Sequence, residues 1–117
     1  MSYQIIKPQE NLDMILGAPE HVVEFCEAAI ESITEFKTNF HKHLTDRNIE
    51  ELRGAGHKIK PGAQMMGADI VLENYEHGKD LIKEEADQEE LKALANEMDE
   101  ICTKIKEDLD KLVEEKG

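Results

Sequence analysis

His57 opens a stretch of the chain, HKIKPGAQMMGA, whose side chains could hold a phosphoryl group. A neutral imidazole offers a nucleophilic nitrogen near neutral pH. Lys60 can meet the phosphoryl oxygens, over which negative charge spreads during transfer. Arg53 and Lys58 add positive charge, and residues 52–68 contain no carboxylate although the chain has a formal charge of -13. The sequence therefore predicts a cationic site around a histidine in an anionic protein.

A helix over residues 48–66 would carry this histidine on its outer side. His57 follows the inward position Gly56, and one residue turns it by about 100° towards solvent. Gly54, Gly62 and Ala63 would lower the surface beside the imidazole, so that the active site of a partner could approach it. We expect an exposed nucleophile in a shallow setting.

Pro61 and Gln64 extend this surface by one further turn. Pro61 has no N–H to donate to the carbonyl of His57, so we expect a local bend that alters the placement of the histidine. Gln64 lies further along the same face. The predicted docking face surrounds His57 and Lys60 and also includes exposed apolar residues of a short N-terminal helix. Its named residues are Arg53, Gly54, Lys58, Pro61, Gly62, Gln64 and, less directly, Lys79.

Apolar residues elsewhere recur at steps of three and four, which indicates amphipathic helices. Capping signals at Asn48 and Asp87 and a stop at Gly67 divide the pattern. A short helix is also expected around 9–16. The predicted inward positions are Val22, Cys26, Ala29, Ile33, Phe36, Phe40 and Leu44; Ile49, Leu52, Gly56, Ile59, Ala63 and Met66; Ala68, Val71, Tyr75, Gly78 and Ile82; and Leu91, Leu94, Met98, Ile101, Ile105 and Leu112.

The predicted fold is all-α: one domain over residues 1–117, an antiparallel up-down four-helix bundle with a short extra N-terminal helix. A length of 117 residues leaves room for one core. The connections are short, which makes neighbouring helices run antiparallel. Aromatic residues make up only 4% of the chain, which favours helices over sheets.

Several other classes of protein fit the sequence poorly. The charge of -13 argues against binding to nucleic acid or to an anionic membrane. No apolar run reaches the length of a membrane span. A di-iron bundle needs Glu-x-x-His pairs, and no histidine here has Glu three residues before it. Cys26 and Cys102 are expected to be buried free thiols. The remaining histidines (His21, His41, His43 and His77) are expected to be ordinary surface residues, and no metal site is predicted.

The stretch from His57 to Ala68 resembles the histidine-containing phosphotransfer (HPt) domains of multistep phosphorelays. Their pattern is approximately His-x-hydrophobic-Lys-Gly-Ser-small-x-x-hydrophobic-Gly-Ala on the second long helix of a bundle. This chain departs from it with Pro61 where Gly is usual and Gly62 where Ser is common. At the spacing of the pattern stand His57, Ile59, Lys60, Pro61, Gly62, Ala63, Met66, Gly67 and Ala68.

The resemblance implies that His57 is phosphorylated, through Nε2, and that Lys60 is its electrostatic partner. It also places a polar residue that contacts the histidine at about Lys79. The partners would be receiver domains of response regulators and a hybrid histidine kinase, with Mg²⁺ on the receiver and no cofactor on this chain. No nucleotide-binding loop is present, so we expect a reversible carrier rather than an autonomous enzyme.

An adaptor bundle that binds receivers without phosphotransfer is the alternative. We further expect a monomeric, cytoplasmic and free-standing protein.

Overall fold

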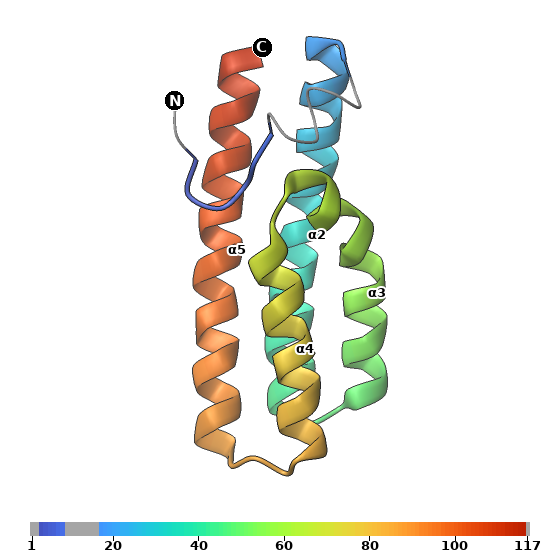
Figure 1. Cartoon of the computed structure of the whole chain (residues 1–117), viewed down its shortest axis with the longest axis vertical. Coiled ribbons are helices and arrows are strands. Elements are labelled where there is room, and N and C mark those ends of the chain that lie inside the picture. The colour runs from blue at the N-terminus through green and yellow to red at the C-terminus, as the bar shows by residue number, and fades with distance from the viewer. Residues whose placement is uncertain (1–2, 9–16, 117) are drawn as a thin grey trace.

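The computed structural model describes residues 3–8 and 17–116, and within them all regular secondary structure is α-helical, as predicted. Figure 1 shows the helices side by side, with the two shorter ones beside the lower part of the two longer ones. The molecule measures 46 × 22 × 20 Å. The short helix expected over residues 9–16 lies outside the described residues. The helices are α2 (Pro19–Thr45), α3 (Ile49–Met66), α4 (Asp69–Lys83) and α5 (Gln88–Lys116).

Local signals in the sequence set the ends of α3 and α5. The Asn48 side chain accepts a hydrogen bond from the N–H of Glu51 at 3.2 Å, which satisfies a donor that the first turn of α3 leaves free. The Asp87 carboxylate does the same for the N–H of Glu90 at 2.9 Å. Gly67 ends α3 with a φ of 69°, a left-handed conformation that glycine adopts without steric cost.

The inward positions predicted for the helices form the core, with one correction on α4. Leu81 is buried there, whereas Ile82, the predicted position, is only partly buried and packs at the core's edge. Ile49 is likewise partly buried. Every other predicted inward position is buried, and Ala95, Cys102 and Leu109 join them on α5.

Residues 3–8 form an N-terminal strap across the bundle. The carboxylate of Asp108 on α5, which is 2% exposed, accepts the backbone N–H groups of residues 4–6 at 2.9, 2.7 and 3.1 Å. The N–H of Lys7 donates to the carbonyl of Met66 at 2.7 Å. The strap thus ties α5 to the connection between α3 and α4.

The connection between α2 and α3 lies against the connection between α4 and α5. The Arg47 guanidinium donates to the carbonyl of Ala86, and Gln88 Nε2 donates to the carbonyl of Thr45 at 2.9 Å. These contacts hold together two connections that are far apart in the sequence. Figure 1 shows both connections at the end of the molecule opposite the C-terminus.

Candidate functional site

His57 lies on the exposed side of α3, as its position in the apolar pattern predicts. The residue before it, Gly56, and Ile59 two residues after it are buried against the core. Within residues 3–8 and 17–116, no side chain forms a hydrogen bond or an ion pair with the imidazole of His57. The ring is therefore presented to solvent by a helix whose inner face is fixed.

The glycines of α3 fall into two kinds. A Cβ atom added at Gly54 or Gly62 would meet nothing within 4 Å, so the packing of the described residues does not require glycine at either position. A Cβ atom at Gly56 would lie 2.0 to 2.5 Å from ring atoms of Tyr75 on α4, so this glycine is required by the contact between the two helices. Only the first kind lowers the outer surface beside His57. Ala63, which was expected to lower it too, is instead buried in the core.

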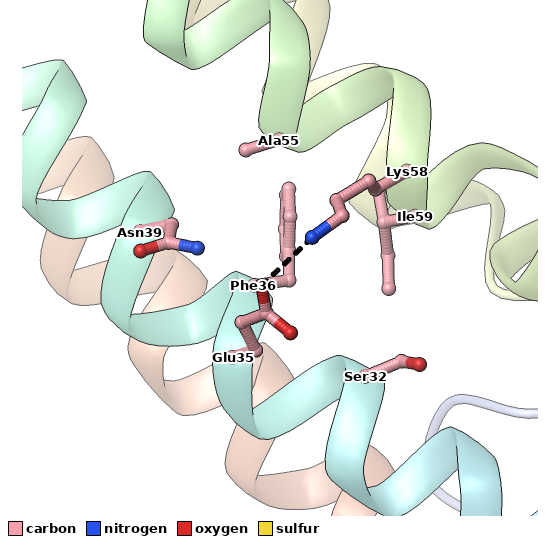
Figure 2. Close-up of a pocket in the computed structure, with 7 residues that line it drawn as sticks. All are labelled: Ser32, Glu35, Phe36, Asn39, Ala55, Lys58 and Ile59. Atoms are coloured by element: carbon pink, nitrogen blue, oxygen red, sulfur yellow. Dashed lines mark hydrogen bonds and ion pairs between the residues drawn. The ribbon is translucent and has the colours of Figure 1, made fainter.

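The cations of the predicted docking face differ in their partners. Arg53 and Lys60 are exposed, and their side chains have no hydrogen bond or ion pair in the part of the chain that the structure describes. Lys58 reaches across to Glu35 on α2, with 3.0 Å between Nζ and Oε1 (Figure 2). Both of these side chains stay largely exposed, at 75% and 56%, so the pair is weak. The acid-free stretch thus has a carboxylate beside it in space.

A small cavity lies between α2 and α3 beneath this ion pair, as Figure 2 shows. Its volume is about 150 Å³, below the range of about 300–1,000 Å³ that is usual for small-molecule sites. It therefore gives no support to a ligand pocket next to His57. Its lining consists of Ser32, Glu35, Phe36, Asn39, Ala55, Lys58 and Ile59.

Pro61 lies inside α3, which continues beyond it to Met66. Because proline has no N–H, the carbonyl of His57 lacks the donor that a helix normally supplies four residues on. We therefore expect the helix to bend near this point. Pro61 and Gln64 are both exposed on this part of the helix.

Lys79, which the resemblance places near the histidine, is held by its own helix. Its Nζ lies 3.1 Å from the Oε2 of Glu76 and 4.7 Å from the centre of the Tyr75 ring, and its side chain is only 19% exposed. Tyr75 in turn packs on Gly56. The structure therefore links Lys79 to α3 through an aromatic ring.

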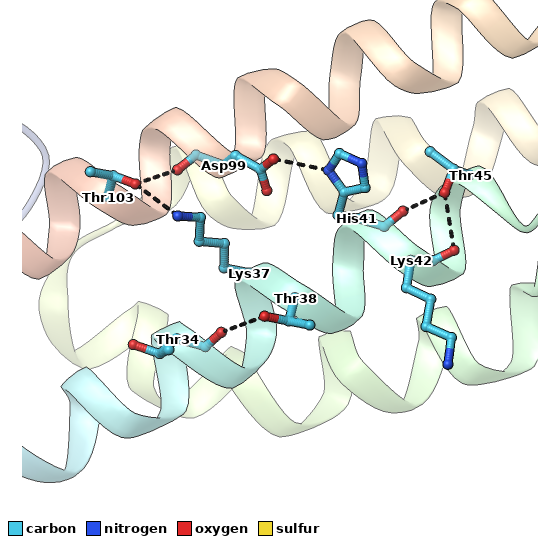
Figure 3. A network of polar contacts seen from close by, with 8 residues as sticks. All are labelled: Thr34, Lys37, Thr38, His41, Lys42, Thr45, Asp99 and Thr103. Carbon is cyan, nitrogen blue, oxygen red and sulfur yellow. Dashed lines mark hydrogen bonds and ion pairs between the residues drawn. The ribbon is translucent and has the colours of Figure 1, made fainter.

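A second histidine has a carboxylate partner that sequence reasoning missed. His41 Nδ1 lies 2.9 Å from the Oδ2 of Asp99, which joins α2 to α5 (Figure 3). Close by, Lys37 donates to the hydroxyl of Thr103 at 3.1 Å. We expected an ordinary surface residue at His41, and no local pattern indicates the pair because 58 residues separate its members.

The two cysteines are buried free thiols, as expected. Burial raises the pKa of the Cys26 thiol to about 11, and the Glu27 carboxylate adds to this rise. Burial also raises the pKa of Cys102 to about 12, with a further rise from Asp99 and an opposing effect from Lys37. Neither thiol is suited to act as a nucleophile near neutral pH.

The described residues show neither a metal site nor a membrane-spanning helix. No three His, Cys, Asp or Glu side chains among residues 3–8 and 17–116 come together as a metal site. Over the same ranges, none of the helices combines the length and the apolar character needed to cross a membrane. Comparison with protein-family models, with curated proteins and with solved structures gave no match.

Proposed function

We propose that this protein is a phosphorelay carrier of the HPt type, in which His57 receives a phosphoryl group from one receiver domain and passes it to another. The observation that carries the proposal is the surface around His57. The imidazole is exposed, and the residues beside it are kept small without any need from internal packing. Such a surface suits a partner that must bring its own active site to the histidine.

The residues that shape this surface make α3 less stable than it could be. Glycine inside a helix costs about 1 kcal/mol relative to alanine, and proline costs about 3 kcal/mol. Gly54, Gly62 and Pro61 all lie within α3, and an added Cβ would have open space at both glycines. A helix that only had to fold would be more stable with alanine there. We infer that these three residues leave room for a partner to approach His57.

The charges fit the same chemistry. Lys60 is exposed one turn after His57, and Arg53 is exposed one turn before it. In the transfer, Nε2 of His57 attacks the phosphorus, the bond from phosphorus to the aspartate oxygen breaks, and the carboxylate leaves with the electron pair. Lys60 neutralises the phosphoryl oxygens, and Mg²⁺ bound by the receiver would supply positive charge on the aspartate side. The reverse steps pass the group to the next receiver.

The proposal also covers the direction of the helices, the partners, the oligomeric state and the cellular location. Short connections, and the contact between the first and third of them, support an antiparallel up-down bundle. The partners are receiver domains and a hybrid histidine kinase that carries one. The charge of -13 supports a role without nucleic acid or anionic membrane. The protein acts as a monomer in the cytoplasm.

The test is phosphotransfer from receiver domains phosphorylated in advance. We expect wild-type protein to gain an acid-labile, base-stable phosphate, His57→Gln to gain none, and Lys60→Ala to gain it more slowly. His77→Gln, which changes another exposed histidine, is the matched control and should behave as wild type. Equal labelling of His57→Gln would refute the assignment. If receivers bind but none labels the wild type, the protein is the adaptor instead.

A further inference from the structure

Tyr75 on α4 packs against the backbone of α3 immediately next to His57. A Cβ atom at Gly56 would lie 2.0 Å from Cζ of the tyrosine, so the ring occupies the space of a side chain at that position. The ring is 8% exposed and lies on the inner side of α3, while His57 lies on the outer side. The two helices can approach this closely only because one of them carries glycine there.

The hydroxyl of Tyr75 reaches the same turn of α3. It donates to the carbonyl of Arg53 at 3.4 Å, a long hydrogen bond. In an α-helix this carbonyl also accepts the N–H of the residue four positions later, which is His57. The carbonyl of His57, by contrast, has no helical donor, because Pro61 lacks an N–H. The ring thus supports the turn of α3 that comes just before the lost helical hydrogen bond.

Lys79 contacts the same ring from its own helix, four residues further along α4. Its ammonium lies 4.7 Å from the centre of the Tyr75 ring and is fixed by Glu76 at 3.1 Å. A cation over an aromatic face is stabilising, more so when it is shielded from water, and Lys79 is 19% exposed.

From these contacts we infer that Tyr75 is a positioning residue, which holds the α3 backbone at His57 in place, and that Lys79 acts through Tyr75. The inference rests on the proposed function for its consequence in phosphotransfer. Its structural part, the order of the backbone at His57, stands independently.

The first experiment measures amide hydrogen exchange at residues 57–59. In Tyr75→Leu we expect exchange there to rise about tenfold, because the local opening of α3 becomes easier. Tyr75→Phe keeps the ring and should stay within about twofold of wild type, since a hydrogen bond this long is weak. Leu81→Ala is the matched control, because it removes buried volume from α4 on the side that faces Leu94 on α5. Unchanged exchange in Tyr75→Leu, or an equal rise in Leu81→Ala, would overturn the inference.

The second experiment measures transfer from a phosphorylated receiver at saturating concentration. Tyr75→Leu should lower the maximal rate about tenfold and leave receiver affinity unchanged, because a misplaced nucleophile costs rate rather than binding. Lys79→Met should slow transfer in the wild-type background and have no further effect in Tyr75→Leu. An equal effect of Lys79→Met in both backgrounds would show that Lys79 acts on the phosphoryl group directly. If wild type accepts no phosphate, the proposed function fails, while the exchange data still decide whether Tyr75 orders α3.

Discussion

Replacement of Asp108 should detach the N-terminal strap and leave the helices folded. The carboxylate is 2% exposed and accepts three backbone N–H groups from residues 4–6. Asp108→Ala removes all three hydrogen bonds. The strap lies at the end of the chain, so it can leave the surface without unfolding α5.

The size of the effect follows from what holds the strap. Three hydrogen bonds to a charged group contribute about 5–9 kcal/mol, and the burial of Ile6 adds about 2 kcal/mol. Fixing the backbone of residues 3–8 costs about 6–12 kcal/mol. These terms nearly cancel, and the hydrogen bond from Lys7 to the carbonyl of Met66 adds about 1 kcal/mol, so docking of the strap is favourable by only a few kcal/mol. Without the carboxylate the balance favours the detached strap.

The assays are amide exchange and urea unfolding. In Asp108→Ala the amides of residues 4–7 should lose their protection, while those of the buried parts of α2 and α5 keep theirs. The free energy of unfolding should fall by about 2 kcal/mol, which is the docking energy that is lost, and not by the full strength of three hydrogen bonds.

Two further variants sharpen this test. Asp110→Ala is the matched control, because Asp110 is exposed and its ion pair with Lys106 spans 3.6 Å, so its removal should change stability by less than about 0.5 kcal/mol. Asp108→Asn should give an intermediate loss, since one oxygen remains to accept. Protection of residues 4–6 that survives in Asp108→Ala would refute the role of the carboxylate. A loss above about 5 kcal/mol would refute the independence of the strap.

Two more predictions concern the glycines of α3 and the buried thiols. Gly62→Ala should raise the free energy of unfolding, measured in urea, by about 0.5–1 kcal/mol. Gly56→Ala should lower it by about 1–3 kcal/mol, because the new methyl group collides with Tyr75. A change of the same sign in both variants would contradict the distinction between the two glycines. Cys26 and Cys102, with pKa values of about 11 and 12 against an ordinary 9.0, should resist a thiol reagent at pH 8 until denaturant is added. Rapid labelling of the folded protein would contradict the burial of the thiols. Because the thiols of the unfolded chain lose their protons at lower pH than those of the folded protein, the free energy of unfolding should decline as the pH rises above about 9.

Much of the local structure could be predicted because it depends on neighbouring residues. The steps of three and four follow from the pitch of the helix, so Phe40 and Leu44 could be assigned to the core without tertiary information. Asn48 and Gly67 act on the turn that contains them, and both cap α3 as expected. The outward direction of His57 follows from the same pitch.

Contacts between distant residues could not be predicted in this way. Asp108 lies on the apolar stripe of α5, three residues after Ile105, and an acid at such a position signals a buried partner. The partner, however, is backbone more than 100 positions away in the sequence. Lys58 meets Glu35 across α2 and α3, a pairing that the charge pattern of either helix does not contain.

The sequence by itself determined the helices, their ends, their inner faces and the exposure of His57, since each of these depends on backbone geometry over a few residues. Only the tertiary structure decided that Tyr75 fills the space over Gly56 and that Lys58 pairs with Glu35 of the neighbouring helix. The reason is physical: these contacts depend on the distance and rotation between two helices, which the packing of the whole core sets.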